Sequence, residues 1–98
     1  MLEIRQTETY SEWFAEFRDA RTKARIDIRI RRLSLGNPGD VKPVGKGISE
    51  MRIDCGPGYR IYYKHTKTTI IVLLCGGDKD SQQKDIAQAK KLAAELED

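Results

Sequence analysis

The sequence is poor in the residues that bind metals or build disulfide scaffolds. It contains one histidine, His65, and two cysteines, Cys55 and Cys75, among 98 residues. These side chains lack the spacing of a zinc site, and two cysteines are too few for a disulfide framework. We therefore expect no metal site, no cofactor, and two reduced cysteines with structural roles.

Long apolar runs are also missing. The sequence has no run of ~18 uncharged residues, which a membrane-spanning helix would need. Residues 1–10 alternate charged with apolar side chains instead of forming the apolar stretch of a signal peptide. The glycine-rich phosphate loop of P-loop proteins and the nucleophile elbow of hydrolases are absent as well. We expect a cytoplasmic protein with no membrane partner and no small-molecule cofactor.

The content of apolar residues is sufficient for one small core. Hydrophobic residues make up 39% of the chain, which is too many for a disordered segment. A chain of this length buries only roughly 60–65% of the surface that its unfolded state exposes. Residues 1–98 are therefore expected to form a single domain, and an active site in it must be a shallow groove.

Positive charge is concentrated in the middle of the chain. The formal net charge is +3, but residues 1–17 carry −3, residues 18–67 carry +8 and residues 68–98 carry −2. A basic excess in one region indicates a surface for a polyanion. The alternative interpretation is a solvated face with no ligand.

Periodicity predicts an α+β fold. Alternation of apolar and polar residues indicates strands over 2–6, 48–54 and 59–65, and an apolar run indicates a doubly buried strand over 69–75. Helices are expected from a capping box at Thr9–Glu12, over 20–35, and from near Ser81. The glycine- and proline-rich segment 36–47 is expected to be an exposed loop. The predicted order is β-α-α-β-β-β-α, with a small, largely antiparallel sheet flanked by helices.

Five arginines recur at helical spacing near the second helix. Their separations of three, four, four and three residues place them on one flank, and they are Arg18, Arg21, Arg25, Arg29 and Arg32. Lys42 and Lys46 follow in the expected loop. We interpret this set as an RNA-binding surface, with acidic residues of a protein partner as the alternative ligand.

Three further basic residues are candidates for catalysis. Arg52 and Arg60 lie on two strands joined by a tight Gly-Pro-Gly turn, and Lys79 follows the next strand. The guanidinium group suits phosphate because it is planar and permanently charged. Cleavage of RNA can use its own 2′-hydroxyl as nucleophile, so a site of this kind needs mainly charge stabilisation and proton transfer. Surface arginines that only solvate the sheet are the alternative.

Four segments together resemble the RelE/ParE toxin superfamily, and most of all its HigB-like branch of addiction module killer proteins. They are RIRRL (29–33), GNPGDVKPVGKGISEMRI (36–53), GPGYRIYY (56–63) and LLCGGDKDSQQKDIAQA (73–89). The resemblance covers essentially the whole chain. It implies a RelE-like fold and a type II toxin held inactive by a cognate antitoxin, often a helix-turn-helix protein.

The resemblance also implies a mechanism. RelE-like members cleave mRNA on the ribosome without a metal, so ribosome and mRNA are the expected partners. Arg60 matches the strand arginine that grips the scissile phosphate, Arg52 falls near a catalytic lysine, and Lys79 falls near a basic residue that assists the leaving oxygen. The match has two departures: one family lysine aligns closest to Glu50, and no tyrosine occurs around residues 84–86.

Two other functions are compatible with the same resemblance. The ParE branch shares the fold but inhibits DNA gyrase without nuclease activity. The other possibility is a member of the superfamily that has lost its toxic activity and only binds its antitoxin.

Overall fold

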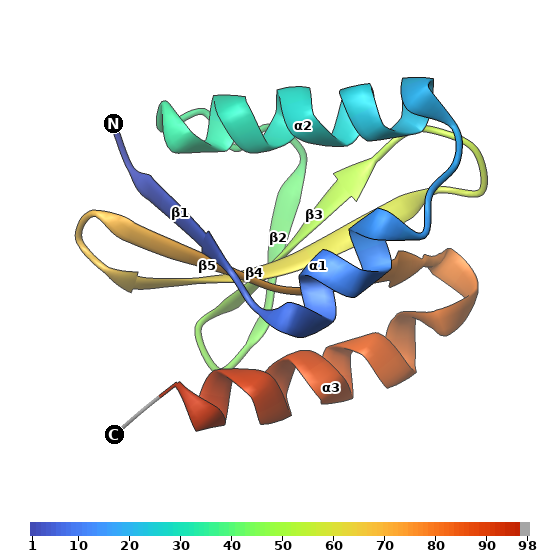
Figure 1. Cartoon of the computed structure of the whole chain (residues 1–98). Helices are drawn as coiled ribbons and strands as arrows, with labels where there is room; N and C mark the ends of the chain where they lie inside the picture. The colour runs from blue at the N-terminus through green and yellow to red at the C-terminus, as the bar shows by residue number, and fades with distance from the viewer. Residues whose placement is uncertain (97–98) are drawn as a thin grey trace.

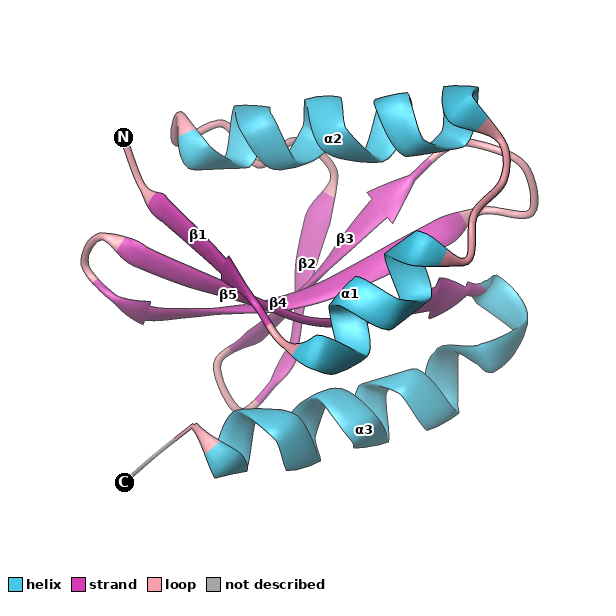
Figure 2. Cartoon of the chain, viewed as in Figure 1, coloured by secondary structure: helices cyan, strands magenta, loops and turns pink. Residues whose placement is uncertain are grey.

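The structure, a computed structural model, describes residues 1–96 and consists of one sheet with helices on both faces (Figures 1 and 2). Its elements are β1 (Glu3–Gln6), α1 (Glu8–Ala15), α2 (Ala20–Ser34), β2 (Val41–Gly45), β3 (Ile48–Ile53), β4 (Tyr59–Lys67), β5 (Ile70–Asp78), the 3₁₀ turn η1 (Lys79–Ser81) and α3 (Gln82–Glu95). The predicted α+β class, with a largely antiparallel sheet between helices, is confirmed.

The sheet has five strands in the order β1-β5-β4-β3-β2. β1 pairs in parallel with β5, and all other neighbours are antiparallel. The antiparallel register brings the end of β3, the start of β4 and the end of β5 to the same end of the sheet. At that end Tyr59 pairs with Ile53 on one side and with Asp78 on the other.

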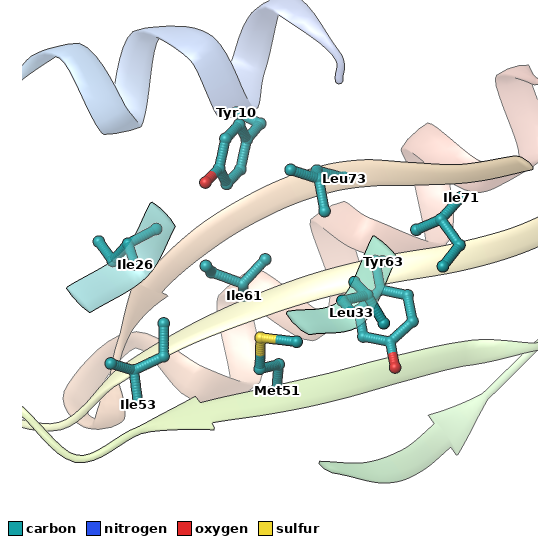
Figure 3. Packing of buried hydrophobic residues seen from close by; sticks show 9 residues of the cluster. All are labelled: Tyr10, Ile26, Leu33, Met51, Ile53, Ile61, Tyr63, Ile71 and Leu73. Carbon is teal, nitrogen blue, oxygen red and sulfur yellow. The ribbon is translucent and has the colours of Figure 1, made fainter. Parts of the chain in front are cut away.

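Apolar side chains cover both faces of the sheet. On one face Tyr10 of α1 and two residues of α2, Ile26 and Leu33, pack on the strands (Figure 3). On the other face Ala89 and Ala93 of α3 pack against a second cluster, whose buried strand residues are Ile48, Tyr62, Val72, Leu74 and Cys75. β5 is therefore buried on both faces, as its apolar run predicts.

The expectation of a loop over residues 36–47 is wrong for part of that segment. Residues 41–45 form β2, an edge strand paired with β3, so the order is β-α-α-β-β-β-β-α. Pro43 is tolerated because an edge strand needs no amide donor on its outer side, and the register shifts between Pro43 and Gly45. Lys42 consequently lies on a strand and Lys46 in the turn that follows it.

The N-cap of the first helix lies two residues before the predicted one. Thr7 is the N-cap: its hydroxyl accepts from the Tyr10 amide at 3.0 Å and donates to the Leu74 carbonyl at 2.6 Å. The second bond is a tertiary contact with β5, which favours Thr7 over the capping box at Thr9. Arg18 also lies outside α2, because Asp19 is the N-cap of that helix.

Both cysteines are free thiols, as predicted. Cys75 is fully buried beneath α3, and its burial, together with the charge of Asp85, raises its pKa to about 12. The thiol therefore stays protonated at neutral pH, which favours a structural role over a nucleophilic one.

Candidate functional site

Arg52, Arg60 and Lys79 line one groove at the end of the sheet. The groove has a volume of about 280 Å³, and its other lining residues are Asp40, Ile53, Asp54, Gly58 and Tyr59. We call it the basic groove. The structure thus brings together the three residues that were predicted from the sequence to act on a phosphate.

Strand register explains why the two arginines meet. Arg52 of β3 is paired directly with Arg60 of β4, so both side chains project from the same face of the sheet, the one covered by α3. Lys79 joins them because Asp78 pairs with Tyr59 and η1 begins at the next residue. Like charges at directly opposed positions repel each other, so this arrangement needs a compensating anion.

Glu50 supplies that anion. Its side chain is fully buried, with 0% of its surface exposed. One carboxylate oxygen, Oε1, lies 3.2 Å from Nε of Arg52 and 3.7 Å from Nε of Arg60. The other, Oε2, accepts hydrogen bonds from the Tyr62 hydroxyl at 3.0 Å and from the Gln82 amide at 2.7 Å. Both arginines face Glu50 through Nε, and both line the groove, where guanidinium groups suit an anion.

The surroundings of Glu50 keep it ionised. Burial alone would raise its pKa, but the hydrogen bonds from Gln82, Arg52 and Tyr62 and the charge of Arg60 outweigh burial, so the pKa lies below its usual value. A buried carboxylate of this kind is stable only with such partners. Glu50 is therefore a positioning residue, which holds two cations side by side beneath the groove.

Sequence reasoning missed this role. Alternation along residues 48–54 places Glu50 with Arg52 and Asp54 on one face, and Asp54 is exposed. Glu50 is buried because the start of α3 covers that part of the face, and Gln82 is the first residue of α3. The signal that could have identified it is the departure from the family pattern, where a lysine aligns closest to Glu50.

The start of α3 is held closely against the sheet. A Cβ at Gly77 of β5 would overlap the carboxylate of Asp85, so only glycine permits this approach. Asp85 is itself buried and accepts a hydrogen bond from Ser81. The segment 84–86, where the family tyrosine is missing, thus supplies a packing residue to the underside of the site.

The groove also contains hydrogen-bond acceptors. Asp40 and Asp54 line it together with the three cations. Ionised carboxylates only accept hydrogen bonds, whereas arginine and lysine only donate them. The groove can therefore hold a phosphodiester on its cations and hydroxyl groups on its carboxylates.

The arginines associated with α2 do not form one uniform surface. Arg29 is half-buried and donates to the backbone carbonyls of Arg52 at 2.6 Å and Pro38 at 3.1 Å, so it anchors α2 to the sheet. Arg25 donates to the carbonyl of Asp54 at 3.2 Å. A hollow of about 410 Å³ lies beside them, lined by Arg25, Ile28, Arg29, Arg32, Ile53 and Asp54. Arg18, Arg21 and Arg32 are exposed.

Residues 1–96 contain neither a membrane-spanning helix nor a cluster of metal ligands. Every helix in this range is too short or too polar to span a lipid bilayer. The same residues contain no group of three or more His, Cys, Asp or Glu side chains arranged to hold a metal ion.

The fold and the groove define a small α+β protein with clustered cations at one end of an antiparallel sheet. Residues 12–96 match the model of the phage derived protein Gp49-like family (DUF891), and the chain belongs to that family. This family is part of the RelE/ParE-like toxin group. A protein of Haemophilus influenzae (strain ATCC 51907 / DSM 11121 / KW20 / Rd), described as an uncharacterized protein, is 50% identical over 95 residues, which cover 97% of this chain and 96% of that protein.

Proposed function

We propose that this protein is the HigB-like toxin of a type II toxin-antitoxin module and cleaves mRNA on the ribosome in the cytoplasm. The observation that carries the proposal is the convergence of Arg52, Arg60 and Lys79 in one groove above a buried carboxylate. Family membership supports it at the level of the RelE/ParE-like group. A cognate antitoxin, often a helix-turn-helix protein, is the proposed inhibitor.

The residues of the groove suit cleavage by the 2′-hydroxyl of the RNA. That oxygen attacks the adjacent phosphorus, and the 5′-oxygen leaves, which yields a cyclic phosphate and a 5′-hydroxyl. Arg52 and Arg60 stabilise the negative charge that builds up on the phosphorane. Lys79 donates a proton to the leaving oxygen. Asp40 and Asp54 are the groove's acceptors for the proton that the 2′-hydroxyl loses, so every proton of the reaction has a partner on this chain or in water.

Mapping mRNA ends tests the proposal directly. After induction in a host without the antitoxin, new 5′ ends are expected within coding regions before DNA synthesis falls. In a purified system the same ends are expected only when ribosomes are present. Loss of DNA synthesis with intact mRNA would instead identify a gyrase-type inhibitor, and continued growth would identify a protein without toxic activity. Either outcome overturns the proposal.

Three exposed arginines on one flank of α2, Arg21, Arg25 and Arg32, are proposed to dock on ribosomal RNA, together with Arg18, Lys42 and Lys46. The double variant Arg21→Glu, Arg32→Glu is expected to weaken ribosome binding and to lower the slope of log affinity against log salt by about 2, because each lost phosphate contact removes about one unit. Binding at several salt concentrations measures this slope.

A control for charge is available on the same helix. Arg31 is exposed but lies on a different side of α2 from the other arginines. Arg31→Glu is therefore expected to change the slope less than the double variant does. Equal slopes for wild type and the double variant would contradict docking through this surface.

A further inference from the structure

A second hollow adjoins the basic groove and is lined mainly by aromatic side chains. It has a volume of about 250 Å³, and its lining residues are Trp13, Glu16, Phe17 and Tyr59. We call it the aromatic hollow. Tyr59 lines both the aromatic hollow and the basic groove, so the two sites share a wall.

The rings of the aromatic hollow are held in place before any ligand binds. The ring centroids of Trp13 and Phe17 are 4.9 Å apart, as are those of Phe17 and Tyr59, and both pairs meet edge to face. Trp13 rests on the backbone of Gly76, where a Cβ would lie 2.5 Å from the indole ring. Three mutually tilted rings form walls instead of a closed stack. A preformed site loses little side-chain freedom when it is filled.

We propose that the aromatic hollow binds the nucleobase of the RNA nucleotide next to the phosphate that is cleaved. This inference rests on the proposed function and adds a basis for sequence preference. Aromatic side chains recognise bases in single-stranded RNA by stacking on them. A base and its phosphate are separated by a single sugar, so their two sites must be neighbours, and the shared residue Tyr59 makes these two sites neighbours.

Glu16 indicates which bases fit. It is exposed, follows the last residue of α1, and places a carboxylate beside the rings. A carboxylate accepts hydrogen bonds from the exocyclic amino group of a base. The aromatic hollow therefore favours adenine, cytosine or guanine over uracil at one position beside the cut.

The test compares the sequences at which the whole protein cuts ribosome-bound mRNA. Phe17→Leu keeps an apolar side chain of similar volume but removes the ring, and Glu16→Ala removes the carboxylate. Wild type is expected to show a preference against uracil at one position beside the cut. Phe17→Leu is expected to lower cleavage about tenfold or more, and Glu16→Ala to weaken the discrimination against uracil. Glu12→Ala is a matched control, because Glu12 is exposed on α1, one turn before Glu16, but does not line the aromatic hollow.

A binding assay separates this inference from the proposed function. Short 2′-O-methyl oligonucleotides cannot be cut, and a set that differs in a single base measures base preference by fluorescence anisotropy. If wild type cuts RNA but the Phe17→Leu and Glu16→Ala variants keep its base preference while folded, the inference fails and the proposed function stands. A second outcome is that wild type cuts no RNA but binds some bases in preference to others, and both variants lose this preference. In that case the proposed nuclease fails and the base site stands. Loss of antitoxin binding in these variants with unchanged RNA preference would assign the hollow to a protein partner and overturn the inference.

Discussion

Replacing Arg60 by alanine is expected to slow mRNA cleavage about 100- to 1000-fold, because one preorganised donor to a developing anionic charge contributes on this scale. Arg60 has 16% of its side chain exposed, in the groove, while its Nε faces Glu50. The substitution removes the terminal amino groups that would hold the phosphate. The measurement is the rate of cleavage of ribosome-bound mRNA, and relief of growth arrest is the matching observation in cells.

Arg5→Ala is the matched control for this substitution. Arg5 lies on the edge strand β1, which is separated by β5 from the strand β4 that carries Arg60, and it forms an exposed ion pair with Glu3. The same change of charge at that place is expected to leave cleavage unchanged. Thermal unfolding of both variants shows whether either loses its fold, and antitoxin binding by Arg60→Ala is expected to persist. Growth arrest as strong as that of wild type in the Arg60→Ala variant would mean that the catalytic assignment is wrong.

The location of the basic groove could be predicted from the sequence in part. The turn Gly56-Pro57-Gly58 predicts a hairpin, and a hairpin brings Arg52 and Arg60 close together. Alternation alone leaves their relative orientation open, because the turn can shift the pairing by one residue and so reverse the face. The observed register pairs them directly and settles that they share a face.

The burial of Glu50 was beyond prediction from local pattern. A glutamate that alternates with apolar residues is typical of a solvated face. Its burial depends on α3, which begins 32 residues later in the chain and contacts it through Gln82. Long-range packing of this kind leaves no trace in the periodicity of a six-residue strand.

The edge strand β2 shows the same limit for the fold. Four glycines and two prolines in residues 36–47 are typical of a loop, and Lys46 even has a positive φ of 58°. The strand forms because β3 offers a free edge for pairing, and an edge position tolerates proline. The helix α2 and the strand β4 could be predicted because their own periodicity matches their final environment.

Glu50→Gln is expected to destabilise the fold by about 3–5 kcal/mol at neutral pH, as the loss of one partner from a buried charge cluster does. The Glu50 carboxylate accepts hydrogen bonds from Arg52, Tyr62 and Gln82 and forms an ion pair with Arg60. An amide in its place can keep hydrogen bonds, because the Tyr62 hydroxyl and the Gln82 side chain can also accept, but it carries no negative charge. The change also leaves two opposed arginines without their anion. Chemical denaturation at pH 7 measures the loss, and Glu3→Gln, in an exposed ion pair, is expected to cost at most about 1 kcal/mol.

The pH dependence of this effect follows from the lowered pKa of Glu50 in the folded state. Its contribution to stability is fully present above the ordinary glutamate pKa of 4.5, and it is lost as the pH falls through the lower folded value. In the unfolded chain Glu50 takes up its proton more readily than in the fold, so acid favours unfolding of wild type. The gap in unfolding free energy between wild type and Glu50→Gln is therefore expected to be constant from pH 7 to about pH 5.5 and to narrow below pH 4.5. A gap that stays constant into acid would show that the carboxylate charge does not hold Arg52 and Arg60 in place.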